Sequence, residues 1–146
     1  MSNDNRIEEM PSIIKIHGDN IGNVWFSTKV AGTTFIPNSK EFLQFLKNNI
    51  PWDKLVIRLF REPENEYDEN AVRVEISLKG TKKSKKVGYI PREEAPLLSW
   101  VLSHEQEYQL DTKEVVLVGG TEDKPNIGIM FGFRILPIGV GQNYED

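Results

Sequence analysis

The feature that most constrains the fold is a series of short apolar segments with a period of two, separated by polar turns. In "NAVRVEISL" (70–78) every second residue from Val72 is apolar, whereas Arg73 and Glu75 fall on the opposite face. This alternation predicts a strand with one buried face. A lysine-rich turn and the strand-like segment "KVGYI" follow at once. We therefore expect an antiparallel hairpin here.

Further strands are expected where β-branched and aromatic residues gather. They are residues 12–17, 24–35, 53–62, 114–120 and 126–136. Two other segments have the apolar spacing of amphipathic helices, residues 38–49 and residues 91–103. Ser39 is a suitable N-cap for the first, and Pro96 falls within the first turn of the second, where proline is tolerated.

About six strands and two helices, joined mostly by local turns, predict a mainly β, α+β fold. A small antiparallel six-stranded β-barrel with helices over its ends satisfies this list. The length of 146 residues fits one domain. We place that domain at residues 12–138, between an N-terminal tail (1–11) and a C-terminal tail (139–146).

Composition excludes several classes of site. There is no cysteine, so disulfides, thiolate metal sites and a cysteine nucleophile are absent. The first ten residues are polar, and no apolar run reaches the length of a membrane span. We expect a soluble cytoplasmic protein with no membrane partner; the sequence leaves the oligomeric state open.

No catalytic motif is present. The two histidines, His17 and His104, have no paired-ligand spacing, and no phosphate-binding loop occurs. The acidic residues of the segment 62–69 could supply oxygen ligands to Mg²⁺, but they lack the EF-hand pattern, and a solvated loop is favoured. We expect a protein without enzymatic activity, cofactor or metal; a magnesium-dependent nuclease on this loop is the weakest alternative.

A nucleic-acid site would have to be local, because the net charge is −4. The segment 79–86 concentrates five lysines, of which Lys83 and Lys85 are candidate phosphate contacts, although such a run is also typical of a solvated hairpin tip. Aromatic residues beside polar turns suit stacking on single-stranded bases, although core packing is expected for each one alone. They are Phe35, Tyr67, Tyr89, Phe131 and Phe133.

Three blocks resemble the HIRAN domain family: "KVAGTTF", "LVIRLFREPENEYDENAVRVEI" and "KKVGYIPREEAPLLSWVL". They follow the family's V-x-G strand, its R-E-P-x-N-x-Y-D-x-N-A-[VI]-x-V block and its V-G-[YHF]-[LI]-P-[RK]-E block, in that order. The resemblance covers about residues 28–136 and is to free-standing members of the bacterial or phage type. It implies a small β-barrel related to OB and SH3-like barrels, and binding of single-stranded DNA at a free 3′ end.

The resemblance also implies roles for individual residues. Tyr67 would pack on the terminal nucleotide, and Asp68 would accept a hydrogen bond from the 3′-hydroxyl while repelling a phosphate at the same place. Tyr89 and Arg92 occupy positions that touch DNA, and Arg92 could meet a phosphate. Phe133, or Phe131, would add a second stacking surface.

The loop around Tyr67 needs support, which we expect from its neighbours. Asn65 and Asn70 would shape it through side-chain-to-backbone hydrogen bonds, and Arg61 and Glu62 would brace it.

One position departs from the family pattern. DNA-binding members have a basic residue followed by tyrosine where this chain has Thr34 and Phe35. Phe35 can still stack on a base, but Thr34 cannot pair with a phosphate. The first hypothesis is therefore a module that binds single-stranded DNA in replication, repair or DNA processing, with a helicase or nuclease as protein partner. The alternative is a protein-binding regulator, such as a phage inhibitor of a host or defence enzyme.

Overall fold

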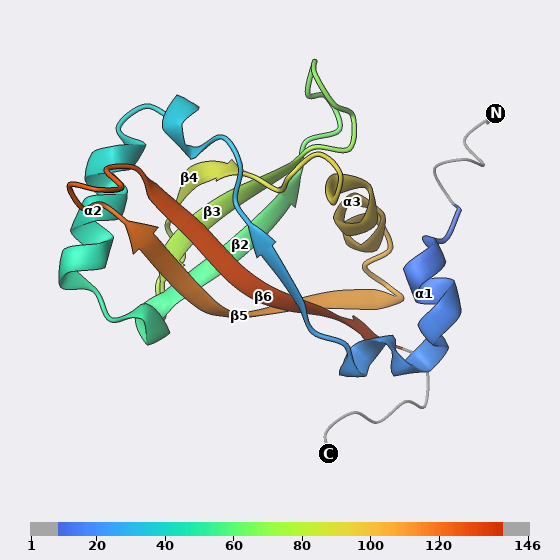
Figure 1. Ribbon diagram of the computed structural model, residues 1–146. Helices are drawn as coiled ribbons and strands as arrows, with labels where there is room; N and C mark the ends of the chain where they lie inside the picture. Colours follow the sequence, from blue (N-terminus) through green and yellow to red (C-terminus); the bar gives the residue numbers. More distant parts are fainter. Residues whose placement is uncertain (1–8, 139–146) are drawn as a thin grey trace.

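The chain forms two antiparallel sheets that enclose the core between them (Figure 1). The computed structural model describes residues 9–138. One three-stranded sheet has the order β1-β6-β5, and the other has the order β2-β3-β4. The strands are β1 (Phe26–Lys29), β2 (Leu55–Arg61), β3 (Val72–Leu78), β4 (Ser84–Tyr89), β5 (Tyr108–Gly119) and β6 (Ile127–Pro137).

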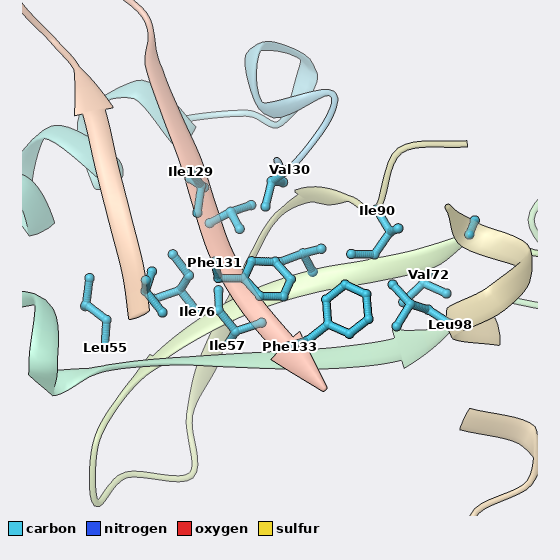
Figure 2. Packing of buried hydrophobic residues seen from close by; sticks show 14 of the residues in the cluster. Val30, Leu55, Ile57, Val72, Ile76, Ile90, Leu98, Ile129, Phe131 and Phe133 are labelled. Carbon is cyan, nitrogen blue, oxygen red and sulfur yellow. The ribbon is translucent and has the colours of Figure 1, made fainter. Parts of the chain in front are cut away.

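The core consists of the inward faces of both sheets. In β3, Val72, Val74 and Ile76 are at most 1% exposed, so the predicted alternation is confirmed. Figure 2 shows the rings of Phe131 and Phe133 directed from β6 toward β2 and β3. Burial of each large apolar side chain contributes about 1.5–3 kcal/mol, and these inward rows therefore hold the two sheets together.

Within residues 9–138, a single backbone bridge joins the sheets, between Ala31 and Tyr89. The two N–H groups donate to the opposite carbonyls at 2.7 and 2.9 Å. Gly88 is needed beside this bridge, because a Cβ there would lie 2.5 Å from the Ala31 carbonyl oxygen. In residues 9–138 no continuous strand pair links the sheets, so they are not closed into a barrel. The mainly β fold is confirmed, and the predicted six-stranded barrel is not.

Opposite the bridge, β2 and β5 touch without pairing. The register of β5 shifts between Lys113 and Val116, and Glu114 has a left-handed φ of 59°. Because a bulge bends its strand, this irregularity gives a physical reason why the edge of β5 does not continue the β2 sheet.

Both predicted helices are present, as α2 (Ser39–Asn49) and α3 (Ala95–Ser103). The strand predicted at residues 12–17 is wrong, because this segment is a third helix, α1 (Ser12–His17). Its Ile14 is 1% exposed and its Ile16 is 76% exposed. A short run of isoleucines fits either structure, and Gly18 (φ 55°) ends the helix.

The strand predicted at residues 24–35 is only partly correct. Strand β1 ends at Lys29, and Gly32, at φ 75°, leads into the 3₁₀ turn η3 (Thr33–Phe35). Two further 3₁₀ helices are η2 (Gly18–Asn23) and η4 (Trp52–Lys54). Strand β5 begins at Tyr108, six residues before the predicted position 114. Among the helices within residues 9–138, none is long and apolar enough to cross a bilayer. The predicted tails lie largely outside the described residues.

Candidate nucleic-acid interface

The loop between β2 and β3 is shaped by its own polar side chains. Asn65 Oδ1 accepts hydrogen bonds from the backbone N–H groups of Tyr67 (2.8 Å) and Asp68 (3.1 Å). Asp68 Oδ1 accepts from the N–H of Asn70 at 2.9 Å. Such bonds let a short side chain replace a missing backbone partner. The predicted role of Asn65 is confirmed, whereas Asn70 contributes its backbone N–H rather than its side chain.

Glu62 connects the root of this loop to the sheet. Its carboxylate accepts hydrogen bonds from Arg73 Nη1 (3.0 Å), Asn65 Nδ2 (3.1 Å) and the Tyr89 hydroxyl (3.0 Å). Partial burial alone would raise the pKa of Glu62, but the hydrogen bonds from Asn65, Arg73 and Tyr89 outweigh it and lower this pKa below 4.5. Glu62 therefore braces the loop, as predicted, and its lowered pKa favours the carboxylate form of this anchor.

Arg73 and Glu75 extend the anchor along β3. Arg73 Nε donates to Glu75 Oε2 at 2.7 Å, and the Ser84 hydroxyl donates to Glu75 Oε1. Burial by itself would raise the pKa of Glu75, yet these hydrogen bonds from Ser84 and Arg73 lower it. Arg61 acts separately, because its Nε donates to the Ser99 hydroxyl at 3.1 Å and ties the end of β2 to α3.

The aromatic ring at the loop tip lies in solvent. Tyr67 is 80% exposed, and the loop that carries it projects from the end of β2 (Figure 1, green, top). Phe35, in η3, is 86% exposed. Tyr89 lies between these two segments, since its backbone pairs with Ala31 and its hydroxyl donates to Glu62. The exposed rings of Tyr67 and Phe35 contribute nothing to the core, and their faces are open to a ligand.

Arg92 and Asp68 lie together beside Tyr67. Arg92 Nη2 donates to the Tyr67 carbonyl at 2.8 Å, and its Nε lies 4.0 Å from Asp68 Oδ2. The Arg92 side chain is 78% exposed, whereas that of Asp68 is 22% exposed. A carboxylate has about four acceptor sites, so Asp68 can accept a further hydrogen bond while it holds the loop.

A comparison with protein-family models gives a match to the HIRAN domain over residues 24–135, most of the chain. The chain belongs to the HIRAN domain family. The matched range contains both sheets, apart from the last two residues of β6, and the whole Tyr67 loop. Comparisons with curated proteins and with solved structures give no match.

Two residues of this HIRAN domain that were expected to stack on bases, Phe133 and Phe131, lie in the core instead. Phe133 is 2% exposed and stacks on Phe26 with ring centroids 5.0 Å apart, and Phe131 is also 2% exposed. Neither has a ring face for a base, so the prediction of a stacking surface there is wrong. The alternation of "IGIMFGF" contained the signal, because both rings share the face of Ile129 and face the core.

The predicted lysines are not at the Tyr67 loop. Lys83 is exposed in the turn between β3 and β4, and Lys85 Nζ lies 5.1 Å from the centre of the Phe42 ring on α2. The site residue that the prediction missed is Lys86. Its Nζ donates to the Tyr89 hydroxyl at 2.7 Å and lies 4.6 Å from the Tyr89 ring centre.

The carboxylates of the acidic segment 62–69 do not gather into a metal-binding cluster. In the part of the chain that the structure describes, no group of three His, Asp or Glu side chains could hold an ion.

Proposed function

We propose that this chain binds single-stranded DNA and recognises a free 3′ end with Tyr67 and Asp68. HIRAN domains bind single-stranded DNA, which supports the general activity. The observation that carries the proposal is the Tyr67 ring, 80% exposed on a loop whose backbone is fixed by Asn65 and Asp68. A rigid exposed ring stacks on a base with little loss of conformational entropy.

Asp68 supplies the discrimination in this proposal. Its carboxylate accepts a hydrogen bond from a terminal 3′-hydroxyl and repels a 3′-phosphate or a continuing strand. Arg92 lies beside Asp68, is the more exposed of the two, and uses one of its five donors on the Tyr67 carbonyl. Its other donors can pair with the phosphate that precedes the last sugar. The protein then acts by binding alone, guiding or blocking another DNA-processing protein.

The test compares two oligonucleotides that differ only in a 3′-hydroxyl or a 3′-phosphate. The wild type should prefer the hydroxyl, and Asp68→Asn should lose that preference. Asparagine keeps an oxygen for the Asn70 N–H, so the loop survives while the charge is removed. Asp123→Asn, at an exposed residue of the β5–β6 turn, is the matched control. Tyr67→Ala should weaken binding by about 1–3 kcal/mol.

Equal and weak binding of both oligonucleotides by the wild type would contradict the proposal. It would favour the second candidate, a protein-binding regulator, which the net charge of −4 and the exposed Thr34 at a family basic position support. Capture of a protein from a host lysate on the immobilised chain, but not on a Tyr67→Ala variant, would then identify the ligand class.

A further inference from the structure

The lysine turn, residues 79–83 between β3 and β4, lies far from the Tyr67 loop, residues 62–71, at the other end of the same sheet. Strand β3 starts after the loop at Val72 and ends before the turn at Leu78. At about 3.3 Å per residue the two ends are about 20 Å apart. The 3′-end site therefore leaves the lysines without a role.

The outer face of the β2-β3-β4 sheet connects the two ends. The strand register places side chains on it in rows: Phe60, Arg73 and Tyr89 near the loop, then Arg58, Glu75 and Lys86. The next row toward the turn is Val56, Ser77 and Ser84. The row nearest the loop thus places Arg73 between two aromatic residues, and the next row adds the cations Arg58 and Lys86.

The cations on this face are held in place. Arg73 Cζ lies 4.8 Å from the Phe60 ring centre, and Phe60 itself is 38% exposed. Arg58 Nε donates to the Ser77 hydroxyl at 3.1 Å, and its Nη2 donates to the Thr81 carbonyl at 3.0 Å. Arg58 therefore points from the sheet toward the lysine turn.

The charge of this region is opposite to that of the chain. The face and turn contain six cations against two carboxylates, Glu62 and Glu75, whereas the whole chain has a net charge of −4. The cations are Arg58, Arg73, Lys79, Lys82, Lys83 and Lys86. A positive track with exposed rings complements a single-stranded polyanion with stacking bases.

We propose that the outer face of β2-β3-β4 and the lysine turn form a second contact surface for the DNA strand, which runs from its 3′ end at Tyr67 toward the turn. Bases stack on Tyr89 and Phe60, and phosphates meet Arg58, Lys82 and Lys83. A 20 Å track holds about six nucleotides at the stacked spacing of about 3.4 Å, within the about 4–16 that comparable modules cover. This inference rests on the proposed function.

The first test is a length series of 3′-hydroxyl oligonucleotides from three to ten nucleotides, measured by fluorescence anisotropy. Affinity should rise with each nucleotide up to about six to eight and then level off. The trimer reports on the 3′-end site alone, through its preference for hydroxyl over phosphate.

The second test removes the far end of the track with Lys82→Ala and Lys83→Ala together. Binding of an octamer should weaken about threefold to tenfold. The slope of log K against log salt should fall in magnitude by about 1.4, since each phosphate contact on a single strand contributes about 0.7. Trimer binding should not change. The control is Lys40→Ala with Lys124→Ala, two exposed lysines outside the track.

The outcomes separate the two proposals. A trimer end preference with no gain in affinity at greater length overturns the track and leaves the 3′-end site intact. Equal weakening by the track and control variants also overturns it. No binding of any oligonucleotide overturns the proposed function and the track together. Displacement of bound octamer by an acidic peptide, with no length dependence, assigns this face to a protein partner instead.

Discussion

The two connections at the ends of the β2-β3-β4 sheet are built in opposite ways. In the 62–71 loop, the side-chain oxygens of Asn65 and Asp68 accept hydrogen bonds from the loop itself, and those of Glu62 join the loop to Arg73 and Tyr89 of the sheet. In the 79–83 turn, Thr81 closes the chain through its hydroxyl and N–H on the Leu78 carbonyl at 2.8 and 3.0 Å, while the side chains of Lys82 and Lys83 lie in solvent. One connection has a fixed geometry, and the other has a concentration of charge.

This difference separates two kinds of recognition. A fixed ring and carboxylate can distinguish one chemical group from another, because a misplaced group loses its contacts. Exposed lysines attract any phosphate, since each is a flexible point charge. The first connection is therefore suited to specificity, and the second is suited to affinity that depends on salt.

The largest effect should follow from breaking the fixed connection at its root. Glu62→Ala removes the acceptor of three hydrogen bonds, including one from Arg73. Hydrogen bonds to a charged group contribute about 1.5–3 kcal/mol, and Arg73 and Tyr89 keep other partners. We expect the free energy of unfolding to fall by about 2 kcal/mol, measured by urea denaturation, together with loss of the 3′-hydroxyl preference.

Glu64→Ala is the control for this prediction. Glu64 is exposed in the same loop, and its removal should change the free energy of unfolding by less than about 0.5 kcal/mol. If the two variants were equally stable, the loop would not depend on the Glu62 anchor, and the contrast between the two connections would fail.

The sequence predicted most of the fixed connection because its signals are local. Asn65 acts on residues within three positions in the chain, where asparagine chemistry can be inferred directly. Glu62 acts on Asn65 in the same way, but its bonds to Arg73 and Tyr89 are between distant positions. The alternation in β3 has the same local character, and it placed Val72 and Val74 correctly in the core. The exposure of Tyr67 is an exception, because core packing is the expectation for each of these aromatic residues alone, and the structure leaves Tyr67 80% exposed.

Other features could not be predicted because they depend on distant contacts. The backbone pairing between the sheets in residues 9–138 joins Ala31 to Tyr89, 58 residues apart. The separation of the lysine turn from Tyr67 depends on how β3 spans the sheet. The isoleucines of α1 carry no decisive period, so packing of Ile14 decides between helix and strand.

A smaller effect should appear as a pH dependence that comes from Glu62 and Glu75, the two carboxylates that share Arg73. The pKa values of Glu62 and Glu75 are lowered in the folded chain. At a pH between the folded and unfolded values the unfolded chain binds more protons, so stability is lost as the pH falls. The free energy of unfolding should decrease from about pH 5 downward, through the ordinary value of 4.5.

Glu62→Gln with Glu75→Gln should flatten this part of the profile, and Glu64→Gln with Glu66→Gln should leave it unchanged. Thermal or urea unfolding between pH 3 and pH 7 measures both. An unchanged profile in the first double variant would mean that other carboxylates produce the acid sensitivity. The segment 79–86 contains no carboxylate, but its Ser84 and Lys86 help to lower these pKa values, so both residues are kept unchanged in this test.

The smallest effect should come from the charged connection. Lys82→Ala with Lys83→Ala removes two exposed side chains that make no contact with the core, and Thr81 still closes the turn. Surface changes of this kind alter the free energy of unfolding by less than about 0.5 kcal/mol. We expect the unfolding curve in urea to overlay that of the wild type.

A loss above 1 kcal/mol would mean that the lysines stabilise the hairpin, and the turn would then be a structural element like the Glu62 anchor rather than a free surface. The measurement thus decides whether the two ends of one sheet have separate tasks, since only a turn that the fold does not need can be reserved for a ligand.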